Sequence, residues 1–380
     1  MRSETAQSIS RGHAPEDPSA AENGTPAFAG NGNPVIFRRL SPPQAVSPRM
    51  SEASIDVVGI GNAIVDVIAH ADEAFLEKEA LVKGTMALID AERAEALYRL
   101  MGPAIEASGG SAGNTMAGLA SLGGSGAYIG KVRDDLLGGV FRHDLTAQGV
   151  RFATPAATAG PGTARCLILV TGDGQRTLNT YLGACVGLGP DDIDPELIAA
   201  AQVTYLEGYL FDPPLAQQAF AKAAAIAHAA GRRVALSLSD PFCVERHRAA
   251  FGGLVDGHVD ILFANEAEIC ALYQTEDFAA AAATVRGRVA IAALTRSAEG
   301  SLVLTAGEEH PVTAAPVARI VDTTGAGDLY AAGFLHGLTR GLPLPTCGRI
   351  GSLCAAEIIS HVGARPETAL SRLAAEAGLA

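Results

Sequence analysis

The chain has 380 residues, and its 41 acidic side chains outnumber its 28 Lys and Arg side chains, which gives a formal net charge of −13. This charge argues against a nucleic-acid-binding protein, which normally presents a basic face. Hydrophobic residues make up 48% of the chain and charged residues 18%, so the sequence is too apolar for a disordered protein and can build a large core.

Membrane and secretory features are absent from the sequence pattern. No stretch approaches the roughly 18 uncharged apolar residues of a membrane span, and the N-terminus lacks the apolar segment of a secretory signal. The cysteines show neither a CxxC pair nor the spacing of metal ligands, which predicts reduced packing residues rather than a zinc site. We therefore expect a soluble cytoplasmic protein, a monomer or homodimer, that binds neither nucleic acid nor membranes.

The first 50 residues differ in composition from the rest, because prolines are interleaved with Ser, Gly, Asn and Ala. Only Val35–Phe37 is a concentrated apolar run, so this segment buries too little surface to offset the entropy lost on ordering. We predict a disordered Pro/Ser/Gly-rich tail over residues 1–50 and a folded domain over residues 51–380. The tail's arginines leave a targeting or interaction role open, and Met50 is an alternative functional start.

From Ile55 onward, short apolar runs alternate with alanine-rich helical segments. The runs predict buried strands at Ile55–Ile60, Val203–Leu206, Val234–Leu238, Ile261–Ala264, Ala290–Leu294 and Ser301–Thr305. Helices are predicted between them, for example at Leu215–Ala230 and Phe278–Arg286. This alternation is typical of βαβ units, so we predict an α/β fold with a central, mainly parallel sheet covered by helices on both faces.

One segment departs from this crossover pattern. Two β-prone runs, Thr163–Val170 and Arg176–Tyr181, flank a turn that reads Thr-Gly-Asp-Gly. Such runs joined by an Asp-Gly turn predict a hairpin. We therefore expect a small excursion from the main sheet here.

The segment Gly59–Asp66 overlaps the end of the first predicted strand and continues beyond it. Because a carboxylate is costly to bury unpaired among apolar residues, we expect Asp66 to face a cleft and to accept hydroxyl hydrogen bonds. The segment lacks the third glycine of a GxGxxG loop, and the chain has no GxxxxGK[ST] motif. These absences argue against a dinucleotide-binding loop here and against a P-loop NTPase.

A glycine-rich loop, Gly109–Thr115, leads into a predicted helix of small residues. Its glycines would let a polyhydroxylated ligand approach the backbone, while Ser111 and Asn114 can donate and accept hydrogen bonds. An ordinary glycine-rich turn between a strand and a helix is the alternative.

Two further predicted strands end in polar residues, at the edge where open α/β sheets bind ligands. Asn265 and Glu268 follow one strand, and the turn Thr295–Gly300 follows another. A helix N-cap with a first-turn acid is the simpler explanation of Asn265 and Glu268.

The strongest motif is Asp322–Asp328, which reads Asp-Thr-Thr-Gly-Ala-Gly-Asp before a predicted helix. Two near-adjacent glycines at a helix start leave backbone N–H groups unshielded, as a phosphate or a developing oxyanion requires. The helix N-terminus stabilises a first-turn anion, so we expect Asp328 to stay ionised at neutral pH. The last four residues of the motif, Gly325–Asp328, alone fit an ordinary helix start, but the full seven-residue motif is far more specific.

Both glycine-rich segments occur in an order that resembles the ribokinase-like carbohydrate and nucleoside kinases, also called the PfkB family, over residues 55–368. The resemblance implies a ribokinase-like fold with a small β lid from segments near residues 64–90 and 150–185. It also implies an ATP-dependent phosphotransferase that uses Mg²⁺ and acts on an alcohol group. The lid would exclude water, which otherwise competes as a nucleophile.

The same resemblance implies roles for individual residues. Asp328 corresponds to the catalytic base, Arg176 to a basic lid residue that closes over the transferred phosphoryl group, and Glu268 to a residue that organises Mg²⁺ through water. The anion hole would be formed by Gly325, Ala326 and Gly327. The implied sugar or ribose ligands are Asn62, Asp66, Gly110, Ser111 and Asn114. The implied ATP-binding residues are Asn265, Thr295, Gly300, Thr324, Gly325 and Gly327.

Two points of the resemblance concern single positions. Ser297 stands where the family usually has a glycine, which puts the close approach of the ATP phosphates to this backbone in doubt. The family also usually has a potassium-type site beside the anion hole, which here would lie near Asp322, Thr324 and Gly363.

Several strings look most like the adenosine kinase branch, namely Gly61–Asp66, Gly84–Asp90, Leu238–Phe242 and Cys354–Gly363. By this likeness, Ile64 and Phe242 are candidates to pack against a purine. We therefore expect phosphorylation of the 5′-hydroxyl of a purine nucleoside, adenosine to AMP, as in purine salvage. A sugar kinase acting on ribose, fructose or a related sugar is the alternative, and a ligand-binding protein that lost the chemistry is the third hypothesis.

Overall fold

The computed structural model describes residues 53–379, so the predicted tail over residues 1–50 lies outside them. Within the described residues, nine strands form a sheet in the order β14-β13-β12-β11-β10-β9-β1-β5-β6. All neighbours pair in parallel except β12 with β13 and β13 with β14. These strands are β1 (Ile55–Ile60), β5 (Gly126–Ile129), β6 (Arg151–Phe152), β9 (Ala201–Glu207), β10 (Arg233–Ser237), β11 (Ile261–Asn265), β12 (Ile291–Thr295), β13 (Ser301–Leu304) and β14 (Glu309–Val312).

Helices cover both faces of this sheet. Neighbouring residues of a strand point to opposite sides, so a strand of consecutive buried residues packs against helices on both faces. Val58 and Ile60 of β1 pack against the apolar sides of α5, α6, α7, α8 and α9. Val57 packs on the other side, among residues of α3, α4, α10 and α11. These helices are α3 (Ser111–Ser121), α4 (Leu136–Ala147), α5 (Pro195–Ala200), α6 (Pro214–Ala229), α7 (Pro241–His258), α8 (Glu266–Tyr273), α9 (Phe278–Val285), α10 (Ala326–Thr339) and α11 (Leu344–Ile358), with α12 (Leu370–Glu376) packed on α10 and α11.

The predicted elements of the main sheet are confirmed. All six predicted strands are present with ends within two residues, and the two named helices are α6 and α9. Short 3₁₀ segments complete the connections, at η1 (Gly183–Gly187), η2 (Pro190–Asp192), η3 (Gly208–Phe211) and η4 (Ser297–Glu299). The six cysteines are free thiols, as expected, and all but Cys270 are buried. No helix within residues 53–379 is long and apolar enough to cross a membrane.

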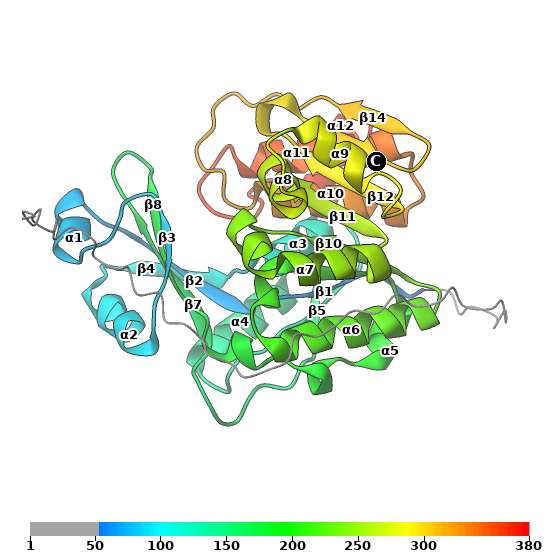
Figure 1. Ribbon diagram of the computed structural model, residues 1–380. Helices are drawn as coiled ribbons and strands as arrows, with labels where there is room; N and C mark the ends of the chain where they lie inside the picture. The colour runs from blue at the N-terminus through cyan, green and yellow to red at the C-terminus, as the bar shows by residue number, and fades with distance from the viewer. Residues whose placement is uncertain (1–52, 380) are drawn as a thin grey trace, which may run out of the picture. The chain divides into compact units, whose positions relative to one another are not determined.

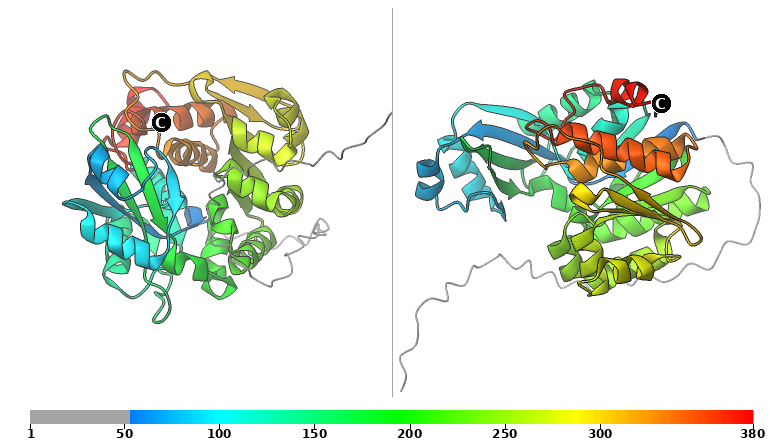
Figure 2. Two further views of the ribbon diagram at one scale, coloured as in Figure 1. Left: turned by 60° about the vertical axis from the view of Figure 1, so that its left-hand side comes forward. Right: turned by 90° about the horizontal axis from the view of Figure 1, so that it is seen from above.

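A second sheet of five strands has the order β3-β8-β7-β2-β4 and lies with α1 (Glu73–Lys78) and α2 (Ala91–Leu100) at the left of Figure 1. Its strands are β2 (Ile64–His70), β3 (Met86–Leu88), β4 (Ala104–Ser108), β7 (Ala164–Val170) and β8 (Arg176–Tyr181). The predicted hairpin is the antiparallel pair β7 and β8. The second view of Figure 2 shows this sheet extending away from the helices that surround the main sheet.

Two strands differ from the predicted lid segments. β4 pairs with β2 in the second sheet although it lies outside those segments, and β6 pairs with β5 in the main sheet although it lies within them. Only Ser108 of β4 is buried, so no buried apolar run indicated this strand. β6 has only two residues, which is too short for a periodic pattern.

Candidate active site

A cavity of about 1200 Å³ is lined by the second sheet together with the loops at the carboxyl ends of the main strands. Every residue predicted for the site lines this cavity except Arg176. The residues brought together are Asn62, Ile64, Asp66, Gly110, Ser111, Asn114, Phe242, Asn265, Glu268, Thr295, Gly300, Thr324, Gly325, Ala326, Gly327 and Asp328.

Asp328 lies in the first turn of α10 and is held by two side chains of α3. Ser111 Oγ donates to Asp328 Oδ1 at 2.6 Å, and Asn114 Nδ2 donates to Asp328 Oδ2 at 2.8 Å. Both donors come from the glycine-rich segment, so the two strongest motifs meet at one carboxylate.

The pKa of Asp328 depends on burial as well as on its hydrogen bonds. Burial raises it above its usual value, and this effect exceeds the lowering by the Ser111 and Asn114 hydrogen bonds. The sequence argument counted the helix N-terminus but not the desolvation of a carboxylate within a cavity. Asp328 is therefore a stronger base than a solvated first-turn acid.

The backbone beside Asp328 has the features of an anion site. Gly325 caps α10 at a φ of +81°, a conformation that favours glycine. A Cβ at Gly327 would meet nothing within 4 Å, and the N–H groups of Gly327 and Asp328 have no hydrogen-bond acceptor within residues 53–379. The absence of a side chain at Gly327 thus leaves these donors open to the cavity.

Gly109 and Gly110 are also required by packing, a role that the sequence reasoning did not predict. A Cβ at Gly109 would lie 2.4 Å from the Asp66 carboxyl group, and a Cβ at Gly110 would lie 2.2 Å from the Asn62 carbonyl oxygen. Gly110 also has a φ of +78°. These glycines allow the start of α3 to pack directly against β2 and the loop before it.

Asp66 faces the cavity from β2, as predicted. Its carboxylate accepts no hydrogen bond from any other described residue, so both oxygens are available to a ligand. Burial raises its pKa to about 6, despite the opposing positive charges of Arg365 and Arg176. A polyhydroxylated ligand would supply the missing donors.

Glu207, at the end of β9, lines the cavity but was missed by the sequence reasoning. It accepts from Asn62 Nδ2 at 2.7 Å and from Ala112 N at 2.8 Å. Burial raises its pKa to about 7. The sequence signal was a carboxylate directly after a buried strand, the same position that pointed to Asn265.

Asn114 and Arg365 make contacts that the sequence reasoning did not predict. The Asn114 amide is used by protein partners, since Nδ2 donates to Asp328 and Oδ1 accepts from Arg365. Asn114 therefore orients the carboxylate, and it also lines the cavity. Arg365 follows α11 in a loop and matched no motif, so no sequence signal marked it.

Asn265 and Glu268 form a capping box at the start of α8. Asn265 Oδ1 accepts from Glu268 N at 2.9 Å, and the Glu268 carboxylate accepts from Asn265 N at 2.9 Å and Asn265 Nδ2 at 2.7 Å. The helix-cap explanation is thus confirmed, although both residues also line the cavity. Burial raises the pKa of Glu268 to about 7, with Asp240 and Asp328 contributing. Within residues 53–379, no group of three or more His, Cys, Asp or Glu side chains is arranged to hold a metal.

Arg176 is paired rather than free. Arg176 Nη1 lies 3.0 Å from Asp322 Oδ2, and both side chains are buried. The same carboxylate accepts from Thr324 N and Gly363 N, each at 3.0 Å. The three residues expected near a potassium-type site, Asp322, Thr324 and Gly363, therefore do lie together, joined by hydrogen bonds from backbone N–H groups. The negative charge of Asp322 is already paired with Arg176.

Ser297 has a φ of +49°, which lies in the left-handed region. This backbone conformation strains a residue with a Cβ and favours glycine. The serine that departs from the family pattern is thus at a strained position in a turn that lines the cavity.

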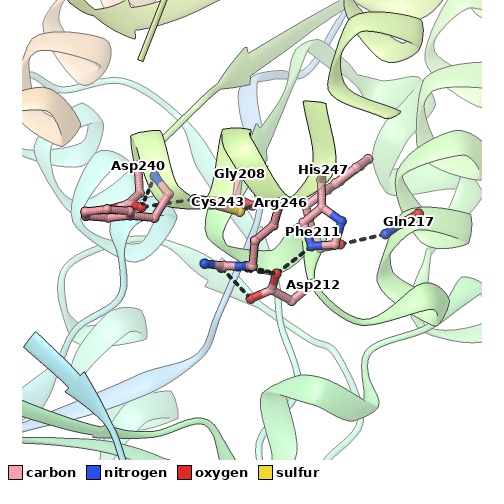
Figure 3. A network of polar contacts seen from close by, with 9 residues as sticks. Gly208, Phe211, Asp212, Gln217, Asp240, Cys243, Arg246 and His247 are labelled. Atoms are coloured by element: carbon pink, nitrogen blue, oxygen red, sulfur yellow. Dashed lines mark hydrogen bonds and ion pairs between the residues drawn. The ribbon is translucent and has the colours of Figure 1, made fainter. Parts of the chain in front are cut away.

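The wall formed by η3 and the start of α7 carries a polar network beside the cavity. Figure 3 shows Asp212 between Arg246 and His247, with Arg246 Nη2 at 3.1 Å and His247 Nε2 at 2.6 Å from its carboxylate. Asp240 caps α7 by accepting from Phe242 N at 2.8 Å. The exposed ring of Phe242 follows this cap and lines the cavity.

The opposite wall is apolar and comes from the second sheet. The side chains that line it are those of Ile64, Met86, Leu88, Ile168 and Leu178. Met86 and Leu88 remain 51% and 45% exposed. Apolar surface left open in a cavity favours a ligand with a flat or apolar part.

Comparisons with known proteins agree with this geometry. Residues 104–369 match the model of the pfkB family carbohydrate kinases. A solved structure named adenosine kinase from Sinorhizobium meliloti is 54% identical, with a TM-score of 0.80, over 86% of this chain and 100% of that chain. A solved structure named probable sugar kinase from Rhizobium etli is 51% identical, with a TM-score of 0.81 and the same coverage. The adenosine kinase of Saccharomyces cerevisiae is 28% identical over 81% of this chain and 95% of that protein.

Proposed function

The chain belongs to the pfkB family of carbohydrate kinases and is a phosphotransferase, and from this premise we propose that it phosphorylates the 5′-hydroxyl of adenosine to give AMP, a purine salvage reaction. The relatives named adenosine kinase support this choice. The proposal rests chiefly on one observation, the apolar wall of the second sheet above Asp66.

The two walls fit different parts of a nucleoside. A purine ring buries apolar area against Ile64, Leu88 and Ile168, whereas a free sugar has no part that gains from such contact. The free carboxylate of Asp66 accepts hydrogen bonds from the ribose hydroxyls. With the base and ribose so placed, the hydroxymethyl group extends toward Asp328.

The transfer step then needs alignment and charge stabilisation. The 5′-oxygen attacks the γ-phosphorus of ATP, the bond from that phosphorus to the bridging oxygen of ADP breaks, and Asp328 takes the hydroxyl proton as the new bond forms. The open N–H groups of Gly327 and Asp328 stabilise the charge on the transferred group. Ser111 and Asn114 hold the base in place throughout.

The residues at the start of α8 fit Mg²⁺, which usually keeps several waters and uses one or two carboxylates. Glu268 supplies one cavity-facing carboxylate, whose pKa is raised mainly by burial and further by the negative charges of Asp240 and Asp328, and a bound cation would favour its ionised form. When bound, the ion neutralises the phosphates of ATP. Thr295 and Gly300 line the same end of the cavity and would contact those phosphates.

A substrate panel tests the choice between nucleoside and sugar, the alternative favoured by the name of the Rhizobium etli neighbour. We expect kcat/KM for adenosine to exceed that for ribose or fructose by orders of magnitude. The matched variants are Leu88→Ser, which lines the cavity, and Ile105→Ser, an exposed side chain of β4 outside it. Only Leu88→Ser should raise the KM for adenosine. A preference for ribose or fructose, or equal effects of the two variants, would contradict the proposal.

A further inference from the structure

Arg365 occupies a position between the two functional carboxylates that no motif indicated. Its Nη2 donates to Ser108 Oγ at 2.9 Å, its Nη1 donates to Asn114 Oδ1, and its Nε is buried without a hydrogen-bond partner among the described residues. Its charge interacts with Asp66 on β2, Asp144 on α4 and Asp328 on α10. The guanidinium therefore lies at the point where the second sheet, α3 and α10 meet.

The chemistry of Asn114 makes this contact directional. An arginine guanidinium can only donate, so the atom of Asn114 that meets it must be the carbonyl oxygen. The other end of the amide is then necessarily the NH₂ group, which donates to Asp328 Oδ2 at 2.8 Å. Without Arg365, the Asn114 amide can rotate and turn its oxygen toward the Asp328 carboxylate. The amide oxygen and the carboxylate would then repel each other.

We propose that Arg365 is a positioning residue for the phosphoryl-transfer reaction: it fixes the orientation of the Asn114 amide on Asp328 and supplies the positive charge that Asp66 and Asp328 share. The proposal rests on the assignment of Asp328 as the base. It goes further by naming the group whose positive charge opposes the protonation of two carboxylates that line one cavity.

A second hydrogen-bond chain anchors the guanidinium. Ser108 Oγ accepts from Arg365 and donates to Asp144 Oδ2 at 2.6 Å, and Ser108 N donates to the same oxygen at 2.7 Å. Asp144 thereby connects the guanidinium to α4, away from the cavity. The charged and titratable groups that face Arg365, Asp66 or Asp328 are Tyr128, Asp144, Cys166, Arg176, Tyr205, Glu207, Tyr209 and Glu268.

Arg176 is the second cation near Asp66, but its guanidinium is already paired with Asp322. Asp328 has Arg365 as the cation that lowers its pKa. Loss of the Arg365 charge should therefore raise the pKa of both carboxyls. The effect should be less opposed at Asp328, because Arg365 is the one described cation that lowers its pKa.

The test compares Arg365→Met with Arg142→Met. Arg142 also donates two hydrogen bonds, to the carbonyl oxygens of Phe152 at 2.8 Å and Thr154 at 2.7 Å, but it lies outside the cavity. We expect Arg365→Met to lower kcat about 10- to 100-fold, as for a misplaced catalytic group. It should also move the acid limb of the pH–rate profile to higher pH. Arg142→Met should change neither.

Two further measurements separate the parts of the proposal. Arg365→Lys keeps the charge but not the planar fork, so its acid limb should stay near that of the wild type while kcat remains lowered. Carbon-13 titration of the aspartate carboxyls in the free enzyme, with Asp66→Asn and Asp328→Asn for assignment, reports both pKa values without any turnover. Both values should rise in Arg365→Met.

The outcomes distinguish this proposal from the proposed function. Unchanged carboxyl titrations in Arg365→Met, or a full kcat in Arg365→Lys, would overturn the role of Arg365. Full turnover in Asp328→Asn would instead overturn the assignment of the base, whatever the titrations show. If Arg365→Met does not fold, the kcat and pH profile of Arg365→Lys decide between the outcomes.

Discussion

Ser111 Oγ and Asp328 Oδ1 are 2.6 Å apart although 217 positions separate the two residues in the chain. The contact joins the N-termini of α3 and α10, and these helices pack against each other through Gly118, where a Cβ would lie 2.5 Å from Leu329 Cδ1. The helix pair thus places the proposed base and the residue that holds it in one arrangement. Variants of this arrangement should separate loss of stability from loss of chemistry.

Gly327→Ala should yield a stable but poorly active enzyme. A Cβ meets nothing within 4 Å at this position, and alanine favours a helical turn by about 0.5–1 kcal/mol over glycine. The methyl group would, however, cover the open N–H groups, so we expect kcat to fall by about 10²-fold or more. Chemical denaturation and steady-state kinetics measure the two effects.

Gly139→Ala is the matched control, because this glycine of α4 also has no atom within 4 Å of a Cβ. It should gain similar stability and keep full activity. Equal activity of the two alanine variants would exclude the proposed anion hole at Gly327.

Asp66→Asn should remove a pH dependence of stability. Because the pKa of Asp66 rises to about 6 in the folded protein, the carboxyl holds its proton more tightly when folded than when unfolded. Its contribution to stability is therefore fully present below pH 3.8 and is lost as the pH rises through 6. Relative to the wild type, Asp66→Asn should gain stability between about pH 4 and 6 and hold that gain above it.

The same variant should lose activity. The kcat/KM of the wild type for the nucleoside should rise from pH 5 to 7 as Asp66 ionises and accepts the hydroxyl hydrogen bonds. Asp66→Asn should raise the KM by about 10²-fold, since hydrogen bonds to a charged group contribute about 1.5–3 kcal/mol each. A wild-type KM in this variant would remove Asp66 from the binding site.

Arg176 and Asp322 should show a strong coupling in a double-mutant cycle. Their side chains are only 6% and 7% exposed, and removing one partner of a buried ion pair costs about 3–5 kcal/mol. Arg176→Met and Asp322→Asn should each approach that cost. The double variant should lose about 1–3 kcal/mol less unfolding free energy than the sum of the two single losses. Denaturation of the four proteins gives the coupling energy.

Arg288 and Asp256 provide the comparison pair, since they lie 3.1 Å apart with both side chains 45% exposed. Their coupling should stay below about 1 kcal/mol. Additive effects at Arg176 and Asp322 would show that the buried pair does not connect the hairpin to the Asp322 loop.

Ser297→Gly should relieve backbone strain, because Ser297 has a φ of +49°. The relief of about 1–2 kcal/mol exceeds the entropy cost of glycine of about 0.4–1 kcal/mol, so we expect a small net stabilisation. The glycine should also lower the KM for ATP by allowing the phosphates nearer to the backbone.

Gln274→Gly is a control at the end of α8, where φ is +54° and the residue does not line the cavity. It should change stability in the same direction and leave the KM for ATP unchanged. An equal shift of KM in both variants would contradict a phosphate contact at Ser297.

The sequence by itself determined the elements and the local motifs. Apolar runs such as Ile55–Ile60 and the Asp-Gly turn of the hairpin are recognisable because strand periodicity and turn chemistry act over a few residues. The loop Asp322–Asp328 was identified in the same way, since its glycines, its N–H groups and its acid are neighbours in the chain. The crossover pattern predicted a mainly parallel sheet but not the order of its strands, which the structure provides.

Only the tertiary structure decided which partner each polar group has. Arg365, Glu207 and the pairing of Arg176 with Asp322 depend on contacts across the fold, and such contacts leave no periodic pattern in the sequence. The same holds for Gly109 and Gly110, whose need for glycine comes from the carboxyl group and carbonyl oxygen packed against them. The raised pKa of Asp328 likewise depends on burial by distant elements, because desolvation is a property of the closed cavity and not of the helix start.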